Sequence, residues 1–418
     1  MEITDRRRAE ELDAADPLGP LLAKSIVTEP DLLYLDGNSL GRLTNPVRRR
    51  LLELVDGEWA TGLVRSWESW IDLPTHVGDA LAKHLVGARP GEVVVGDATT
   101  VCIYKAATAA IAARPGARAV VTDDDNFPTD RYVLEGLAAR HGLDYREVPS
   151  DPVHGPDPDA IAAALDGAAV LCLSHIAYGS GALADMAALT ELAHEHGALA
   201  LWDLSHSVGS VPVDLDGSGA DLAVGCTYKY VSAGPGAPAF TYVRRGLQDV
   251  LRQPIWGWFG QRDQFAMAPG YRPVDGIRSW LTGSPAMLGL VCVEAGVAHL
   301  ADAGIERLRA KGMALTALAV DLADAWLAPQ GFTLASPRDP ERRGSHVALA
   351  HPDAWRISRA LIDVAGVVPD FRAPDRLRLG PAPIATRFVD VWDALDRLRR
   401  LVENGAHERH VPAPRRVT

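Results

Sequence analysis

Short apolar segments alternate with helical segments between about residue 90 and residue 245 of this chain. Parallel strands that are buried on both faces have near-continuous apolar sequences, and helices connect them. The segments expected as strands are Glu92–Asp97, Ala117–Asp123, Leu143–Val148, Ala169–His175, Ala198–Asp203, Asp221–Cys226 and Ala239–Val243. Helical patterns lie between them at Thr100–Ala113, Asp130–His141 and Asp185–His196. This alternation predicts an α/β fold with a mostly parallel seven-stranded sheet, whose ligands bind at the carboxyl ends of the strands.

The length of 418 residues favours more than one domain, because one compact core rarely extends over so long a chain. We expect an N-terminal arm at 1–45 that joins the small domain, a large domain at 46–304, a small C-terminal α/β domain at 305–405 and a loose tail at 406–418. Pro285–Leu327 is expected to be one long helix. Further strands are expected at Gly331–Ala335, His346–Ala350, Val367–Phe371 and Arg376–Leu379, and further helices at Asp353–Ala365 and Val389–Val402.

Composition and charge exclude several classes of protein. The hydrophobic fraction of 47% and the charged fraction of 23% are typical of a globular chain. The net charge of −12 leaves no basic stripe, so nucleic acid is not an expected partner. No segment resembles a membrane span or a signal peptide, and the cytoplasm is the expected location. Neither disulfides nor a metal site are expected from the widely spaced cysteines, which are Cys102, Cys172, Cys226 and Cys292.

The strongest candidates for catalysis lie at the ends of two successive predicted strands. Asp203 closes an apolar strand, where a carboxylate points from a buried edge toward a cleft. Lys229 follows the next strand, 26 positions later, and its amine can form an imine with an aldehyde. Pyridoxal 5′-phosphate (PLP) needs both groups, because the lysine holds its aldehyde and a carboxylate keeps its pyridine nitrogen protonated. The alternative is that Asp203 caps a helix and Lys229 lies on the surface. The joint occurrence of the two residues in an alternating α/β chain disfavours this alternative.

Two further segments have the residues that such a cofactor requires. In Gly96-Asp-Ala-Thr-Thr100 a strand ends and a helix begins, so backbone amides and the hydroxyls of Thr99 and Thr100 can bind a phosphate. The same threonines could instead simply cap the helix. Phe127 follows another strand and can stack on a flat ring. Asp130 provides either a second polar contact or a favourable charge at a helix start.

Six motifs together resemble the kynureninase family. They are Leu35-Asp-Gly-Asn-Ser-Leu-Gly41, Asn126-Phe-Pro-Thr-Asp130, Trp202-Asp-Leu-Ser-His206, Gly225-Cys-Thr-Tyr-Lys-Tyr230, Gly257-Trp-Phe-Gly260 and Asp370-Phe-Arg-Ala-Pro374. They occur in the family's order from about residue 30 to residue 400. The resemblance implies the fold-type I PLP architecture and a homodimer with shared active sites. It also implies hydrolysis of the β,γ carbon–carbon bond of L-kynurenine or 3-hydroxy-L-kynurenine, which yields anthranilate or 3-hydroxyanthranilate and L-alanine, as in tryptophan catabolism and NAD biosynthesis.

The resemblance also implies roles for individual residues. Lys229 matches the lysine that carries the cofactor, and Asp203 matches the partner of the pyridine nitrogen. Tyr228 matches a tyrosine that binds the phosphate and helps return a proton to the alanine fragment. The other residues implied around the cofactor are Thr99, Thr100, Phe127, Asp130, Ser174 and His206.

Some implied contacts concern the substrate or a neighbouring subunit. Trp258 matches a tryptophan of the phosphate site that the neighbouring subunit contributes, and Ser284 falls where the family has Thr or Asn near the phosphate and the substrate. Arg378 matches the arginine that binds the substrate's α-carboxylate, for which Arg372 is a weaker candidate. The remaining residues expected to contact the substrate are Ser39 and Trp67.

The chain departs from the family pattern at two positions. Pro383-Ile-Ala385 lacks the tyrosine of the family's Pro-Leu-Tyr, and Gly283-Ser284 replaces a Gly-Thr or Ser-Asn pair. Both changes remove side-chain volume near the substrate, which suggests a biosynthetic variant for a ring-substituted kynurenine as an alternative function.

Two alternatives from outside the family are less well supported. A cysteine desulfurase usually has His before its lysine and a Cys in a mobile loop, whereas Tyr228 precedes Lys229 here. A PLP-less binding or regulatory protein is disfavoured by the intact set of catalytic residues, and an absorbance scan would identify it.

Three weaker features have simpler interpretations beside the functional ones. Trp67 and Trp70 either line an aromatic substrate pocket or form one apolar helix face. His194 and His196 are expected on a solvated helix face, and the run Arg6–Arg8 is expected at a solvated helix end.

Overall fold

A computed structural model describes residues 2–409 of the chain. Its largest sheet has seven strands in the order β2-β10-β9-β8-β7-β3-β4, and within this sheet β10 alone runs antiparallel to its neighbours. The strands are β2 (Val93–Val95), β3 (Ala119–Asp123), β4 (Asp144–Val148), β7 (Ala168–Ser174), β8 (Leu199–Asp203), β9 (Leu222–Gly225) and β10 (Phe240–Val243). The predicted mostly parallel sheet of seven strands is therefore confirmed.

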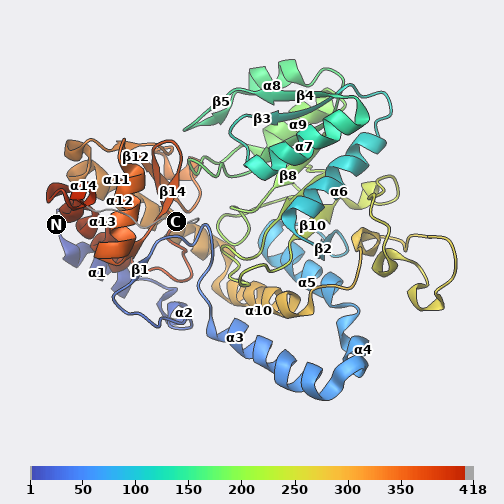
Figure 1. Cartoon of the computed structure of the whole chain (residues 1–418), viewed down its shortest axis with the longest axis horizontal. Coiled ribbons are helices and arrows are strands. Elements are labelled where there is room, and N and C mark those ends of the chain that lie inside the picture. Colours follow the sequence, from blue (N-terminus) through green and yellow to red (C-terminus); the bar gives the residue numbers. More distant parts are fainter. Residues whose placement is uncertain (1, 410–418) are drawn as a thin grey trace.

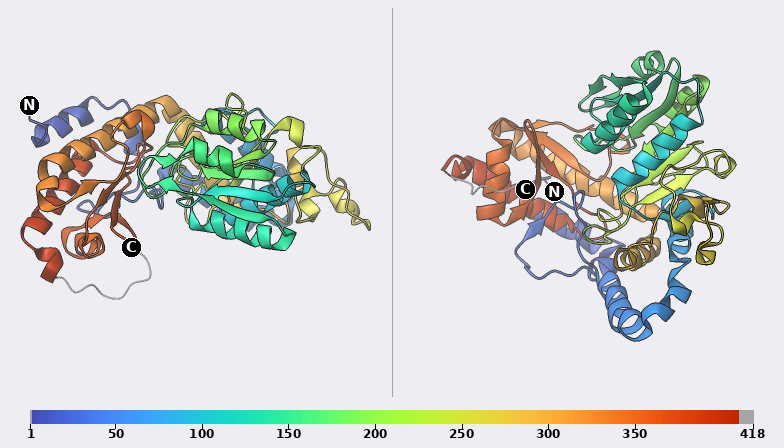
Figure 2. Two further views of the ribbon diagram at one scale, coloured as in Figure 1. Left: turned by 90° about the horizontal axis from the view of Figure 1, so that it is seen from above. Right: turned by 45° about the vertical axis from the view of Figure 1, so that its right-hand side comes forward.

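Helices cover both faces of this sheet, as Figure 2 shows from two directions. Val120 and Leu201 point into one apolar core, whereas Val121 and Trp202 point into the other. Successive strand residues point to opposite faces, so strands that are apolar throughout form a core on each side. The first core is covered by α6 (Thr99–Ala112) and α7 (Pro128–His141), and the second by α5 (Leu73–Leu81), α9 (Met186–Glu195) and α10 (Met287–Ala303).

The carboxyl ends of the parallel strands bring the predicted catalytic segments to one edge. β7 ends at Ser174 and β8 at Asp203, and these two residues are paired in the register of the sheet. Lys229 follows β9, the next strand in the sheet, and Phe127 follows β3 on the other side. The strand order therefore explains how residues that are up to about a hundred positions apart in sequence meet at one site.

The prediction of one long helix over Pro285–Leu327 is wrong. The segment forms α10 and α11 (Ile305–Trp326), which meet at an angle of 80°. Gly304 lies between them with φ +80°, a backbone conformation that glycine adopts without a Cβ clash and that ends α10. Among the described residues no single helix is long and apolar enough to cross a membrane, although α10 and α11 pass that test as a bent pair.

A second, smaller sheet has the strand order β11-β12-β15-β14 and is antiparallel throughout. The expected strand Val367–Phe371 divides in two, because β13 pairs with β1 near the N-terminus while β14 joins this sheet. Ala9, Leu33 and Leu35 share an apolar core with α11 and α13. The elements of this part are β1 (Leu33–Tyr34), β11 (Thr333–Leu334), β12 (Val347–Ala350), α12 (Ala354–Ala360), β13 (Val367–Val368), β14 (Asp370–Arg372), β15 (Arg376–Leu379) and α13 (Phe388–Glu403).

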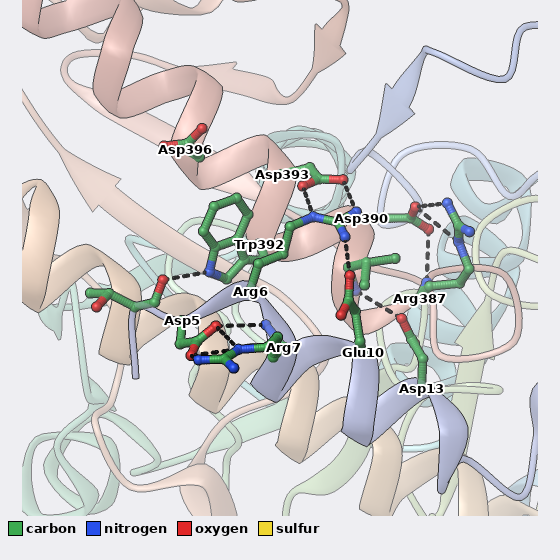
Figure 3. A network of polar contacts seen from close by, with 12 residues as sticks. Asp5, Arg6, Arg7, Glu10, Asp13, Arg387, Asp390, Trp392, Asp393 and Asp396 are labelled. Carbon is green, nitrogen blue, oxygen red and sulfur yellow. Dashed lines mark hydrogen bonds and ion pairs between the residues drawn. The ribbon is translucent and has the colours of Figure 1, made fainter. Parts of the chain in front are cut away.

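An ion pair and hydrogen bonds attach the N-terminal helix α1 (Arg6–Ala14) to α13, as Figure 3 shows. Nε and Nη2 of Arg6 lie 2.7 and 2.9 Å from the two carboxylate oxygens of Asp393. Asp13 accepts a hydrogen bond of 2.7 Å from the backbone amide of Phe388 at the start of α13. The run Arg6–Arg8 lies at a solvated helix end as expected, with the Arg6 side chain 42% exposed, and the planar fork of Arg6 also matches a carboxylate on another helix.

His194 and His196 are exposed at the end of α9, as expected, and Nε2 of His194 also lies 2.7 Å from a carboxylate oxygen of buried Asp221. The expectation of a loose tail needs correction. Residues 406–409, expected in a loose tail, form the short helix α14 (Ala406–Arg409), in which His407 is buried and Ala406 packs against the second core. The rest of that predicted tail, residues 410–418, lies outside the described residues.

Helical segments also precede the large sheet and project from the rest of the molecule in Figure 1. Exposed apolar side chains lie along this projection, among them Trp59, Leu63 and Val64. The projecting segments are α3 (Asn45–Leu52), a π-helix at Glu53–Gly62, a 3-10 helix at Leu63–Ser66 and α4 (Trp67–Trp70).

The other elements are short. They include α2 (Gly19–Leu22), the hairpin of β5 (Ser150–Asp151) and β6 (Gly155–Pro156), and α8 (Pro158–Ala164). Short π-helices lie at Ala82–Val86 and Leu361–Ala365, and 3-10 helices lie at Arg245–Leu247, Trp258–Gly260, Gln264–Ala266, Ile277–Trp280, Ala328–Gln330 and Pro340–Arg342.

Candidate active site

A cavity of about 360 Å³ lies at the carboxyl edge of the seven-stranded sheet. This volume is within the range of small-molecule sites. The residues predicted from the sequence that line it are Thr99, Thr100, Phe127, Asp130, Asp203, His206, Tyr228 and Lys229. Its other lining residues are Asp97, Ala98, Thr129, Ser205, Gly236, Ala237, Pro238 and Ala286.

Lys229 is buried at the centre of this group. Its Nζ lies 3.2 Å from Nε2 of His206 and 5.8 Å from the centroid of the Phe127 ring. Burial, together with the charge of Lys229, holds the pKa of His206 well below its ordinary value, so the imidazole is neutral and can accept a hydrogen bond from the ammonium group. The ring of His346, from the smaller sheet, lies 5.5 Å from that of His206. The amine is thus held between an aromatic face and a neutral acceptor.

Two carboxyl groups, Asp203 and Asp130, lie together at the inner end of the cavity. Burial raises the pKa of both, and the negative charge of Asp203 raises that of Asp130 further. Asp203 is stabilised as an anion because its Oδ1 accepts a hydrogen bond of 2.8 Å from the Ser205 amide and because Lys229 is close. We therefore place the negative charge on Asp203 and a proton on Asp130. The two carboxyl groups share a side-chain hydrogen bond, in which protonated Asp130 donates to Asp203.

The N-terminus of α6 forms another part of the cavity wall. Ala98 occupies the N-cap position and no side chain caps the helix, so the interpretation of Thr99 and Thr100 as a plain N-cap is wrong. Their hydroxyls and the first amides of a 14-residue helix line the cavity. Such an end attracts anions because its amides are free and its dipole is positive.

Tyr228 lines the same cavity next to Lys229. Burial raises the pKa of its phenol, with a smaller contribution from Cys226. The hydroxyl therefore keeps its proton at neutral pH and can donate it in a hydrogen bond or to a reacting atom.

Arg378 lies outside the cavity lining and is only 1% exposed. Its Nη1 donates to the carbonyl oxygen of Tyr178 at 2.5 Å, and the ring of Tyr178 meets that of Phe127 edge-on at 5.4 Å. Its Nη2 lies 3.5 Å from Oγ of Ser39, so the two predicted substrate contacts are brought together. Sequence reasoning missed Asp370, which forms a buried ion pair with Arg378 although it belongs to one of the quoted motifs.

Arg372, the weaker candidate, shares the same carboxylate. Its Nη2 lies 3.1 Å from Oδ2 of Asp370, and its side chain is 40% exposed. Asp370 and Arg378 are paired in the register of β14 and β15, which fixes their approach. A substrate carboxylate that binds Arg378 must therefore share this arginine with Asp370.

Ser174 is close to the cavity without lining it. Its Oγ donates to Oδ1 of Asn126 at 2.7 Å, and the same oxygen accepts a hydrogen bond of 2.8 Å from the Phe127 amide. Ser174 and Asn126 line a neighbouring cavity of about 410 Å³. Ser174 therefore contributes to the first cavity by positioning Phe127 through Asn126.

Besides Arg378, Ser39 and Ser174, three further predicted site residues do not line the cavity within one chain. Trp258 is 37% exposed and packs against Phe259 and Phe265, and Ser284 is exposed. The ring centroid of Trp67 lies 5.5 Å from that of Trp70 and 5.8 Å from that of Phe259, as the interpretation of an apolar helix face requires. A role for these residues in a site needs a second chain.

Sequence reasoning also missed Asp97 and Ser205, which belong to quoted segments but were given no role. Asp97 has φ +59°, and a residue with a short polar side chain directly before a helix could have indicated such a turn. The turn Gly236–Pro238 lines the cavity, as its Gly- and Pro-rich sequence suggests for a loop beside a site. The arrangement as a whole can hold a flat, anionic, aldehyde-bearing ring.

Comparisons with known proteins identify the family of this chain. Residues 308–398 match the family model of the kynureninase C-terminal domain. The chain is 43% identical over 410 residues to a kynureninase from Pseudomonas fluorescens, covering 96% of both proteins. It is 40% identical to a kynureninase from Burkholderia pseudomallei (strain K96243), again covering 96% of both.

Solved structures with the same fold come from other enzymes. A cysteine desulfurase from Thermococcus onnurineus NA1 superposes with a TM-score of 0.76 at 18% identity, covering 94% of this chain and 98% of that one. A cysteine desulfurase from Escherichia coli has a TM-score of 0.77 at 17% identity, covering 93% and 98%. At this identity the likeness concerns the fold alone, which is that of the fold-type I PLP enzymes, whereas the sequence relatives define the family. The chain belongs to the kynureninase family.

Proposed function

We propose that this chain uses PLP to hydrolyse L-kynurenine or 3-hydroxy-L-kynurenine to L-alanine and the corresponding anthranilate. The relatives that support this cover 96% of the chain and are named kynureninase. The observation that carries the proposal is one cavity in which the Lys229 amine, the Asp203 carboxylate and the free N-terminus of α6 face the same space.

The cavity fits PLP on the chemistry of its walls. The uncapped end of α6 with Thr99 and Thr100 suits the phosphate, and Phe127 offers an aromatic face. The paired carboxyl groups suit a protonated pyridine nitrogen, because the negative charge of Asp203 stabilises a positively charged ring. Lys229 lines the same cavity, so its amine would be available to the aldehyde of a bound PLP.

When bound, PLP withdraws electrons from the substrate's α-carbon, and Asp203 maintains this effect by keeping the ring protonated. Arg378 holds the α-carboxylate, and its guanidinium is already oriented by Asp370 and the Tyr178 carbonyl. Lys229 removes the α-proton, while neutral His206 at 3.2 Å accepts a hydrogen bond from its Nζ. Water then adds to the γ-carbonyl, the bond between the β- and γ-carbons breaks, and Tyr228 with Lys229 returns protons to the alanine fragment.

The proposed enzyme is a homodimer with shared active sites, located in the cytoplasm and acting in tryptophan breakdown. Exposed aromatic side chains support an interface, because Trp256 is 70% and Phe265 66% exposed close to Trp258. Trp258 and Ser284 would complete the phosphate site of the partner.

Turnover on several substrates tests the proposed function. We expect the PLP-loaded protein to release one alanine for each anthranilate, with 3-hydroxykynurenine at least as good a substrate as kynurenine, because Ala385 and Ser284 leave space that larger family residues would fill. Kinetics on kynurenine, 3-hydroxykynurenine and ring-methylated analogues measure this. Ala385→Tyr should shift kcat/KM toward unsubstituted kynurenine. No turnover of any kynurenine, together with sulfur release from cysteine, would replace this function with that of a desulfurase.

A ring-substituted kynurenine as the natural substrate is the second candidate function. Ala385 is partly buried and packs against the core of the large sheet, but it does not line the cavity. In this case Ala385 acts on ring specificity through its neighbours or through the second subunit. A strong preference for unsubstituted kynurenine would contradict this second candidate function.

Hybrid dimers test whether the sites are shared. A Lys229→Ala protomer and a Trp258→Ala protomer are each defective alone, but one site of the mixed dimer combines an intact Lys229 with an intact Trp258. We expect mixing to restore activity toward about a quarter of the wild-type level at equal amounts, as random pairing of two protomers gives. Subunit exchange is verified with differently tagged protomers. Absence of recovery after proven exchange contradicts shared sites.

A further inference from the structure

Lys105 is one of five lysines in the chain and is buried behind the start of α6. It is 2% exposed, and its Nζ donates to Oδ2 of Asp97 at 2.6 Å and to the carbonyl oxygen of Trp280 at 2.7 Å. A compact ammonium group suits two acceptors at this spacing, whereas an arginine fork would need more room. The mechanism described above gives this buried ion pair no task.

Asp97 occupies a demanding position. It adopts φ +59° directly before α6, a conformation that Asp and Asn tolerate better than most residues. Its Oδ1 accepts a hydrogen bond of 2.9 Å from Oγ1 of Thr282. The carbonyl oxygen of Thr282 in turn accepts a hydrogen bond of 3.1 Å from the Phe259 amide. Asp97 thereby joins the turn to the segments that carry Ser284 and Trp258.

The same residue creates an electrostatic problem. Asp97 lines the cavity together with Thr99 and Thr100, so its carboxylate lies beside the helix end that would bind a phosphate. A phosphate monoester carries about two negative charges at neutral pH, and like charges at short range inside a partly buried site repel strongly. The turn needs the acceptor oxygens of Asp97 for its hydrogen bonds, whereas the negative charge of Asp97 disfavours binding of the phosphate.

We propose that Lys105 is a positioning residue for cofactor binding, which cancels the charge of Asp97 and so makes the turn at α6 able to bind the phosphate group. This inference rests on the proposed PLP site. It assigns a function to a buried pair whose lysine does not touch the cavity. The ligand class is a phosphate ester, so binding of free pyridoxal, which has no phosphate, should not depend on the Lys105–Asp97 pair.

Three variants separate charge from packing. Lys105→Met removes the cation, Asp97→Asn removes the anion while retaining an acceptor and tolerance of positive φ, and the double variant removes both. The dissociation constants of PLP and of pyridoxal are measured by absorbance titration of apoprotein made from each holoenzyme, together with apoprotein melting temperatures. Lys105→Met should weaken PLP binding on the order of 30- to 100-fold and pyridoxal binding less than about 3-fold. Asp97→Asn should bind PLP at least as tightly as wild type, and the double variant should recover to within about 5-fold of wild type.

The outcomes distinguish the possible failures. The inference is overturned if Lys105→Met binds PLP like wild type, if it weakens PLP and pyridoxal equally, or if the double variant is as weak as Lys105→Met. If Lys105→Met does not fold, Lys105→Gln, which keeps a donor for the Trp280 carbonyl without the charge, is judged by the same comparison. Failure of wild-type apoprotein to bind PLP at all would instead refute the cofactor assignment itself.

Discussion

Lys229→Ala should abolish kynurenine hydrolysis and the covalent attachment of the cofactor. We expect a loss of at least about 10⁴-fold in kcat, because this amine both holds the aldehyde and transfers the α-proton. Borohydride treatment of the wild-type protein should remove its visible absorption band and leave the reduced cofactor on Lys229, identified by peptide mass spectrometry. The variant should bind PLP without the reducible link.

Lys83→Ala is the matched control, because Lys83 is exposed and lies outside the cavity. It should keep wild-type turnover and wild-type labelling. A reduced cofactor found on any other lysine, or a link that persists in Lys229→Ala, would contradict the assignment of Lys229.

Much of the fold could be predicted because it depends on local patterns. Most of the seven strand segments are nearly continuous apolar runs, and β7 and β8 were located within about one residue of their observed bounds. The helix break at Gly304 was not predicted, because apolar periodicity continues on both sides of this residue. Its positive φ depends on how α10 and α11 pack. A single glycine in a helical pattern does not reveal such a turn.

The site was predicted unevenly for a similar reason. Asp203 and Lys229 stand out because polar residues that end apolar strands need an explanation. The pairing of Asp370 with Arg378 depends on the register of β14 and β15, and the pairing of Lys105 with Asp97 on a turn of the backbone. Trp258 and Ser284 lie outside the cavity of one chain, and their proposed role in a partner's site would require a second chain, which one sequence cannot position.

Replacement of Asp203 by Asn tests the division of charge between the two carboxyl groups. Asn has nearly the same volume as Asp but no charge to keep the ring protonated, so kcat should fall on the order of 10³-fold or more while PLP remains bound. Asp221→Asn is a useful control, because Asp221 is also a buried carboxylate of this sheet but binds His194 and the Ala200 amide instead of lining the cavity. It should lower the melting temperature and leave kcat close to wild type.

Asp130→Asn provides the sharper comparison, because Asp130 lies beside Asp203 in the same cavity. Burial and the charge of Asp203 raise the pKa of Asp130, so this group is protonated and an uncharged amide resembles its resting form. The loss in kcat should therefore be much smaller than for Asp203→Asn, and the absorbance of the bound cofactor should titrate as in wild type. Kinetics and spectra measured in parallel decide the point. Near-normal turnover in Asp203→Asn, or a larger loss in Asp130→Asn, would show that the negative charge resides on Asp130, and the roles of the two residues would have to be exchanged.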